Sequence, residues 1–159
     1  MSLTVSQLTA LKLAILADPV LAAQPLNSDG AFAIALALNL EAVPPFVVWR
    51  TNVPTADMKK AMVWTEFIAR SAGEREAWQF MLANGIVDAS QVNVRQGVQD
   101  IFSGPGGAGS RAAIVAIVKR NATRAEQILA TGIGTTAAPA TLSFEGRLTF
   151  QDVEAARAS

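Results

Sequence analysis

The segment whose residues best fit a chemical site is Gly104–Gly109, because its glycines follow the G-x-G-x-x-G pattern of dinucleotide-binding loops. In those proteins the loop follows a buried strand and opens a helix, so that backbone N–H groups face a pyrophosphate. Here the preceding residues, 96–102, have a helical and polar pattern. A P-loop needs Lys and then Ser or Thr after the last glycine, and this chain has Ser110 and Arg111. The segment therefore predicts a mobile loop and not a nucleotide site.

Three residue types that carry much of enzyme chemistry are missing, since the 159 residues include no Cys, His or Tyr. Thiol nucleophiles, disulfides, thiolate zinc sites and histidine-based triads are thereby excluded. No serine has a lysine three residues downstream, and no pair of carboxylates or calcium-type loop stands out. We therefore expect no catalytic residues, no cofactor and no metal, and we expect that the protein is not an enzyme.

The net charge of the whole chain does not indicate which kind of partner it binds. The 13 Lys and Arg residues balance 13 Asp and Glu residues, so no global basic field would attract nucleic acid. The one basic cluster is Lys119, Arg120 and Arg124, on one side of a predicted helix. Two interpretations stay open: a solvated helix face, or a contact with an acidic partner or with DNA phosphates.

An aromatic and a cation follow the diproline Pro44-Pro45, which cannot lie inside a helix. Trp49 and Arg50 are residue types that anchor protein interfaces. They equally fit a core tryptophan with an arginine that extends from it to water. Both interpretations are kept.

The elements that would position these residues are mainly α-helical. Apolar residues at helical spacing predict six helices in a body of residues 1–130, and a strand and a short helix in an arm of residues 131–159 of the same domain. The fold prediction is a bundle of five to six helices with an extended Pro-rich segment and a short β-like C-terminal arm. Trp78 and the apolar window 31–38 are expected in the core. The predicted helices cover residues 4–18, 30–40, 55–72, 74–84, 88–102, 111–130 and, in the arm, 149–157.

The N-terminus lacks the basic region of a signal peptide, and the most apolar window, 31–38, is too short to span a bilayer. We expect a mature chain that begins near Met1, lies in the cytoplasm of the cell that makes it and has no membrane partner.

Four tracts together resemble a group of small proteins encoded among the virion structural genes of tailed bacteriophages. The tract that ends at Gly146 is the most specific. In chain order the tracts are Val43-Pro-Pro-Phe-Val-Val-Trp-Arg-Thr51, Val98-Gln-Asp-Ile-Phe102, Arg120-Asn-Ala-Thr-Arg-Ala-Glu126, and Thr131-Gly-Ile-Gly-Thr-Thr-Ala-Ala-Pro-Ala-Thr-Leu-Ser-Phe-Glu-Gly146 with Asp152-Val153.

That group has largely no assigned activity, so the resemblance implies a setting: a virion protein assembled in the host cytoplasm. By similarity to head-to-tail connector adaptors, it implies a ring of identical subunits that docks on the portal and receives the tail. The interface candidates are then Trp49, Arg50, Lys119, Arg120 and Arg124, with Thr141, Leu142 and Phe144 of an arm that could dock on a neighbour. Deletion of 131–159 is expected to leave a folded body that no longer assembles.

Further roles fit the same setting. A capsid-decorating or head-completion protein, or a tail terminator, would share this composition and partner with capsid or tail proteins. A DNA-binding packaging component would use Lys119, Arg120 and Arg124 on duplex and would bind it in a strongly salt-sensitive manner. In a connector the same residues would at most touch packaged DNA passively.

Overall fold

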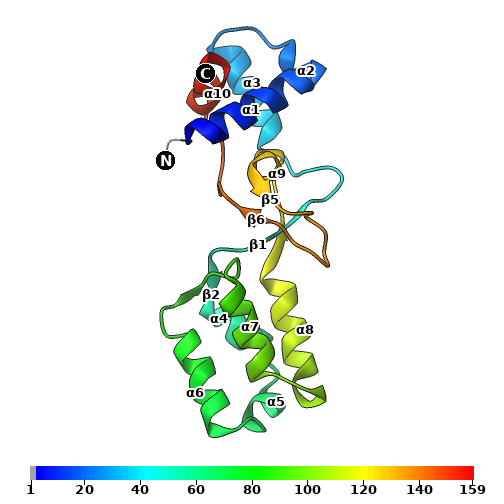
Figure 1. Ribbon diagram of the computed structural model, residues 1–159, viewed down its shortest axis with the longest axis vertical. Helices are drawn as coiled ribbons and strands as arrows, with labels where there is room; N and C mark the ends of the chain where they lie inside the picture. Colours follow the sequence, from blue (N-terminus) through cyan, green and yellow to red (C-terminus); the bar gives the residue numbers. More distant parts are fainter. Residues whose placement is uncertain (1–2) are drawn as a thin grey trace. The chain divides into compact units, whose positions relative to one another are not determined.

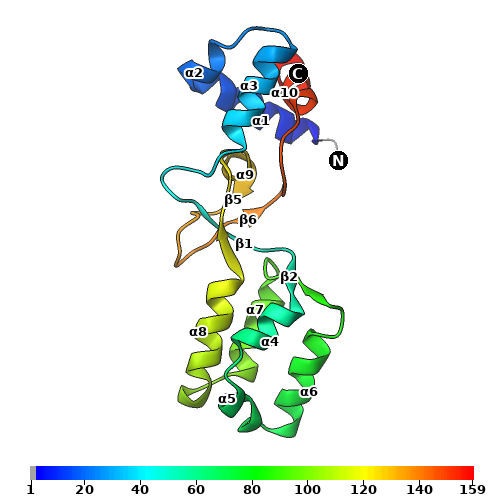
Figure 2. The same ribbon diagram turned by 180° about the vertical axis from the view of Figure 1, so that it is seen from behind.

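The computed structural model describes residues 3–159, which divide into two compact units. Unit 1 consists of Met1–Val48 and Asn121–Ser159, and unit 2 consists of Trp49–Arg120. Unit 2 is continuous in sequence and is inserted between the two segments of unit 1. The predicted boundary between residues 130 and 131 lies inside unit 1. Figure 1 and Figure 2 show the elements of each unit from opposite sides.

The chain is mainly helical, with 56% of residues in helices and 11% in strands, which confirms the predicted class. The predicted count of five to six helices is not confirmed, since residues 3–159 form ten α-helices, most of them short. The α-helices are α1 (Val5–Ala17), α2 (Pro19–Ala22), α3 (Ser28–Leu38), α4 (Thr55–Ala61), α5 (Trp64–Ile68), α6 (Ala72–Met81), α7 (Val92–Ile101), α8 (Ala108–Ile117), α9 (Arg124–Leu129) and α10 (Phe150–Ala158), and the one 3-10 helix described is η1 (Pro105–Gly107).

The strands are short and form three two-stranded pairs, β1 with β4, β2 with β3, and β5 with β6. In the antiparallel β2–β3 pair, Val53 lies opposite Val87, and in the antiparallel β5–β6 pair, Ala130 lies opposite Leu142. Their bounds are β1 (Val47–Trp49), β2 (Val53–Pro54), β3 (Ile86–Val87), β4 (Lys119–Asn121), β5 (Ala130–Thr131) and β6 (Thr141–Leu142).

The C-terminal helix α10 contributes one buried face to the main core of unit 1. It packs against α3 and α1, and the three helices lie together in both views (Figures 1 and 2). Val153 and Ala156 of α10 are fully buried among Leu11, Ile34 and Leu38. The side chain at the helix start, Thr149, accepts the N–H of Asp152 at 3.2 Å and so completes the predicted cap. Part of the predicted arm, including Leu148 and Val153, therefore belongs to this core, so we expect its removal to destabilise unit 1.

A second, small cluster in unit 1 joins the Pro-rich segment to the C-terminal arm. Val48, Ala122 and Ala140 are buried there, with Phe46 packed against them. Gly134 has a φ of +72°, and a Cβ at this position would lie 2.1 Å from the Phe46 ring. Only glycine fits this close approach, because it has no Cβ and tolerates positive φ.

Unit 2 has its own core, built by α4 to α8. Trp78 is 2% exposed and meets the buried Phe102 edge to face, with ring centroids 5.1 Å apart. Met58 and Ile114 are buried in the same cluster. The predicted core position of Trp78 is confirmed.

Two of the predicted helices are each broken in the structure, and long-range hydrogen bonds explain both breaks. The predicted helix 55–72 is interrupted because Met62 and Val63 are extended, and the Val63 N–H bonds to the Ser110 hydroxyl at 3.0 Å. The predicted helix 111–130 ends at Ile117, and Ala122 exchanges backbone hydrogen bonds with residues 42 and 46. A backbone group that pairs with a distant segment cannot also pair within a helix.

Candidate interaction surfaces

Trp49 lies beside two cations in unit 2. The guanidinium carbon of Arg95 is 4.5 Å from the centroid of the Trp49 ring, and the ammonium nitrogen of Lys119 is 5.3 Å from it. Both distances lie within the range of cation–π attraction. The indole is half-buried and also packs against the core of the unit. Its surroundings are thus partly core and partly basic surface.

Arg50 forms hydrogen bonds with backbone groups of two segments of unit 2. Its guanidinium donates to the carbonyl of Ile117 at 2.9 Å, its own N–H donates to the carbonyl of Val118 at 2.9 Å, and its carbonyl accepts the N–H of Ala89 at 3.0 Å. The side chain is half-buried. Arg50 therefore joins the end of α8 to the residues after β3, and it lies in the same part of unit 2 as Lys119.

The predicted basic helix face does not exist. Lys119 and Arg120 lie in β4, beyond the end of α8, and Arg124 opens α9 in unit 1. Arg124 forms an ion pair with Asp18 at 2.8 Å. The hydrogen bond from Arg124 holds the pKa of the Asp18 carboxyl below its ordinary value, and backbone N–H groups at the start of α2 act in the same direction. Arg124 thus has a structural partner within its own unit.

The C-terminal arm packs on its own unit. Thr141 and Leu142 form β6, and Leu142 contacts the small cluster around Val48. Phe144 packs against the main core of unit 1. Of the three candidates in the arm, Thr141 alone is exposed.

Glu126 is a buried carboxylate that the sequence interpretation did not single out. It is 2% exposed, accepts the N–H of Thr123 at 3.0 Å and accepts the N–H of Gly146 at 3.2 Å. It therefore fixes the start of α9 to the tract that the sequence marked as most specific. The signal for it was present, because Thr123 and Glu126 have the spacing of a capping box.

Two side chains of unit 2, Glu66 and Arg70, form hydrogen bonds with the backbone of the glycine-rich segment. The carboxylate of Glu66 accepts the N–H groups of Gly109 and Ser110 at 3.0 and 2.7 Å, and these are the donors that a phosphate would need. Hydrogen bonds from Ser110, first from its side chain, lower the pKa of Glu66. Arg70 donates to the carbonyls of Ser103 and Gly106 at 3.0 and 2.8 Å. The loop is thus held on both sides by internal hydrogen bonds, and its anion-binding groups already have a carboxylate.

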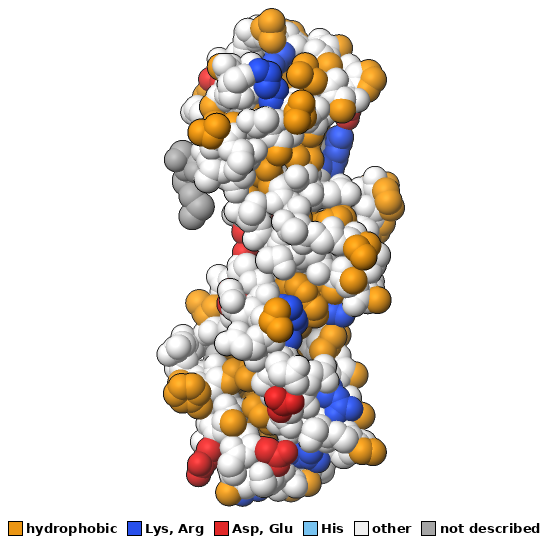
Figure 3. All heavy atoms as spheres, viewed as in Figure 1, with side chains coloured by type: hydrophobic (Ala, Val, Ile, Leu, Met, Phe, Trp, Pro, Cys, Tyr) orange, Lys and Arg blue, Asp and Glu red, His pale blue; other side chains and the backbone are white. Residues whose placement is uncertain are grey.

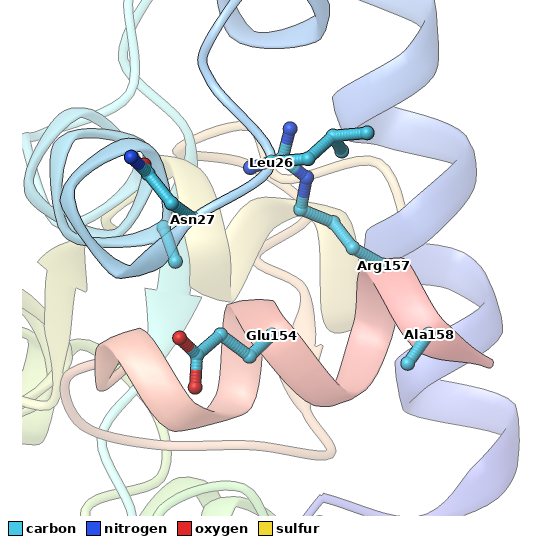
Figure 4. A pocket seen from close by; sticks show the side chains of 6 residues that line it. Leu26, Asn27, Glu154, Arg157 and Ala158 are labelled. Carbon is cyan, nitrogen blue, oxygen red and sulfur yellow. The ribbon is translucent and has the colours of Figure 1, made fainter.

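A small open pocket of about 230 Å³ lies between the start of α3 and α10. Figure 4 shows Glu154 and Arg157 extending from α10, with Leu26 and Asn27 in the segment before α3. Glu154 accepts the hydroxyl of Ser28 at 2.7 Å, and Arg157 donates to the carbonyl of Pro25 at 2.8 Å. Both charged groups therefore support the fold locally.

Large apolar side chains are exposed on both units, and Figure 3 shows hydrophobic atoms scattered over one face of each. On unit 1 they lie mainly on and beside α1 and α3, and on unit 2 on α5 and α6. Single exposed apolar residues are common on protein surfaces, whereas apolar residues that adjoin one another are typical of surfaces that bind other proteins; Phe32 and Leu36 adjoin in this sense, because they lie one turn apart on α3. The largest exposed side chains on these four helices are Leu13, Leu16, Phe32, Leu36, Trp64, Ile68 and Phe80.

No group of three or more acidic side chains between residues 3 and 159 is placed to hold a metal ion. None of the helices in that range has the length and hydrophobicity of a membrane span. Comparison of the chain with models of protein families, with curated proteins and with solved structures gives no match.

Proposed function

We propose that this chain is a structural protein of a tailed-phage virion, a ring-forming head-to-tail connector that docks on the portal and receives the tail. The observation that carries the proposal is the exposure of large apolar side chains along helices of both units, such as Phe32 and Leu36 on α3 and Trp64 and Phe80 in unit 2. When a partner covers such surfaces, the free energy falls because apolar area is removed from water. The resemblance of four tracts to phage virion proteins supplies the setting.

The internal use of the polar groups supports assembly over catalysis. Glu66 and Glu126 accept backbone N–H groups, and Arg124 is paired with Asp18. Each of these side chains stabilises a loop or a helix start within its own unit. The large apolar side chains that stay exposed on both units are suited to binding.

A DNA-binding role has one observation in its favour. Arg95 and Lys119 lie beside the Trp49 ring in unit 2, and cations beside an aromatic ring also suit nucleic acid. A packaging protein would bind duplex with an affinity that falls steeply as salt rises. A capsid-decorating or head-completion protein, or a tail terminator, would use the same apolar surfaces with different partners.

The test is the mass of the purified protein, alone and mixed with the portal ring of its phage, measured by native mass spectrometry. We expect the portal ring to gain several copies of this chain, bound as a further ring. An unrelated helical protein of similar mass serves as the control for non-specific adsorption. A portal mass that does not change, together with binding to capsid or tail proteins or to duplex, would overturn the connector role in favour of the role of the partner that binds.

A further inference from the structure

The zero net charge of the chain is the sum of two opposite charges. Unit 2 has nine Lys and Arg residues and six Asp and Glu residues, a formal charge of +3, whereas unit 1 has four and seven, a formal charge of −3. Opposite charges on two surfaces favour their encounter and disfavour contacts between like surfaces. Two copies of this chain therefore attract each other best when unit 1 of one copy faces unit 2 of the other.

Unit 1 offers an apolar stripe along α3. Phe32 and Leu36 lie on one face of the helix, and Leu40 follows just beyond its end, with exposed fractions of 61%, 54% and 61%. Residues four apart share a helix face, and this pattern is the one by which a helix docks in a groove. The carboxylate of Asp29, one turn before Phe32, is exposed and forms no hydrogen bond or ion pair within residues 3–159. We call Phe32, Leu36 and Leu40 the α3 stripe.

Unit 2 offers an apolar groove of about 520 Å³ between α5 and α6. Its inner wall is formed by buried side chains, among them Phe67, Trp78 and Leu82, and Trp64 stands at its rim with 63% of its surface exposed. Tryptophan in a pocket with a buried apolar wall is the residue type that most often dominates binding energy. We call this feature the α5–α6 groove.

The rim of the groove carries positive charge, which is opposite in sign to Asp29 beside the α3 stripe. Lys59 lines the groove, and Lys60 follows it at the end of α4. Both ammonium groups are exposed, and neither has a hydrogen bond or ion pair among residues 3–159. They match the unpaired carboxylate of Asp29 beside the stripe.

We propose that the α3 stripe of one copy docks in the α5–α6 groove of a second copy. This inference deepens the proposed function and rests on it for the setting of a ring. The two surfaces differ and both belong to the same chain, so every copy can use one with each neighbour. A head-to-tail contact of this kind closes into a ring when the rotation between neighbours allows it.

Cross-linking tests the contact directly, because the chain contains no cysteine. Leu36→Cys places a thiol in the stripe, and Ala83→Cys places one at an exposed residue that lines the groove. A short bis-maleimide is used because a disulfide demands Cα atoms within about 7 Å. We expect no cross-linked dimer from either variant alone, dimers and nothing larger from their mixture, and a ladder of oligomers from the double variant.

Leu16→Cys is the matched control, since Leu16 is also an exposed leucine of a unit 1 helix and lies outside the stripe. Mixed with Ala83→Cys, it should give no dimer above background. Dimers from Leu36→Cys alone would indicate a symmetric contact between stripes and would overturn the proposal. The absence of dimers from the mixture of Leu36→Cys and Ala83→Cys would overturn it too.

Charge reversal gives a second, independent readout by sedimentation velocity at low salt. Asp29→Lys or Lys59→Glu alone should raise the dissociation constant of self-association at least about threefold, and the two changes in one chain should restore it. A double variant that stays as weak as the single variants would overturn the pairing of these surfaces. Cross-linking without binding to the portal would leave this contact standing and reject the connector role, and binding to the portal without cross-linking would do the reverse.

Discussion

The replacement Trp78→Ala gives the sharpest test of the core of unit 2, because the chain contains a matched control. Trp78 is 2% exposed and contacts Phe102, whereas Trp64 is 63% exposed on the neighbouring helix α5. Both are tryptophans of the same unit. Trp64→Ala removes the same atoms from a site where most of them touch water.

The expected loss follows from the area that Trp78 buries. An aromatic side chain of this kind removes about 150–250 Å² from water, which at about 25 cal/mol per Å² corresponds to about 4–6 kcal/mol. Measured replacements of buried aromatic residues by alanine lower the free energy of unfolding by about 3–5 kcal/mol. We expect that range for Trp78→Ala and about 1–2 kcal/mol for Trp64→Ala, because 63% of the Trp64 surface is exposed. Since a unit of about 70 residues has a total stability of about 4–10 kcal/mol, the first change removes a large part of it.

The assay is urea unfolding followed by tryptophan fluorescence and far-UV circular dichroism. All three tryptophans of the chain, at positions 49, 64 and 78, lie in unit 2, so fluorescence reports on that unit and circular dichroism on both. With a slope of about 2 kcal/mol per molar urea, a loss of about 3–5 kcal/mol lowers the midpoint by about 1.5–2.5 M. Trp78→Phe, which keeps an aromatic ring, provides a milder variant if Trp78→Ala does not fold. Equal midpoints for Trp78→Ala and Trp64→Ala would refute the assignment of Trp78 to the core.

Three further predictions concern the buried polar groups and α10. The lowered carboxyl pKa of Glu66 implies stability that is present at neutral pH and is lost as pH falls through that pKa; Glu66→Gln should flatten this acid dependence of the urea midpoint. Glu126→Ala leaves the N–H groups of Thr123 and Gly146 without their acceptor, and should lower the stability of unit 1 by about 2–4 kcal/mol. Thermal melts followed by circular dichroism measure this loss, and equal melts for the variant and the parent would contradict it. Deletion of residues 149–159 removes the buried Val153, and should abolish the circular dichroism transition of unit 1 while the fluorescence transition of unit 2 persists; a retained unit 1 transition would show that α10 is dispensable.

Local signals predicted the starts of the first and the last helix. Thr4 and Thr149 have a polar residue three positions on, and each begins a helix at the next residue, as expected from the capping-box spacing. The periodicity that placed Trp78 in the core is local in the same sense, since the helix α6 needs only its own residues to define a buried face.

Features that depend on distant partners could not be predicted. The break after α4 follows from the bond between Val63 and Ser110, which are 47 positions apart. The ion pair between Asp18 and Arg124 spans 106 positions, and nothing in the local sequence of either residue indicates it. The basic cluster was predicted on one helix face because its residues are close in sequence, and the strand β4 between α8 and α9 separates them.

Net charge shows the same limit at the level of the whole chain. The balance of 13 and 13 charges led to the expectation of no strong electrostatic field, but the fold separates them into a basic and an acidic unit. Both self-association and DNA binding would then weaken with added salt, so salt sensitivity alone does not distinguish them. The charge reversal does: Lys59→Glu combined with Asp29→Lys should restore self-association, whereas DNA phosphates, which are always negative, would gain no compensating partner at position 59.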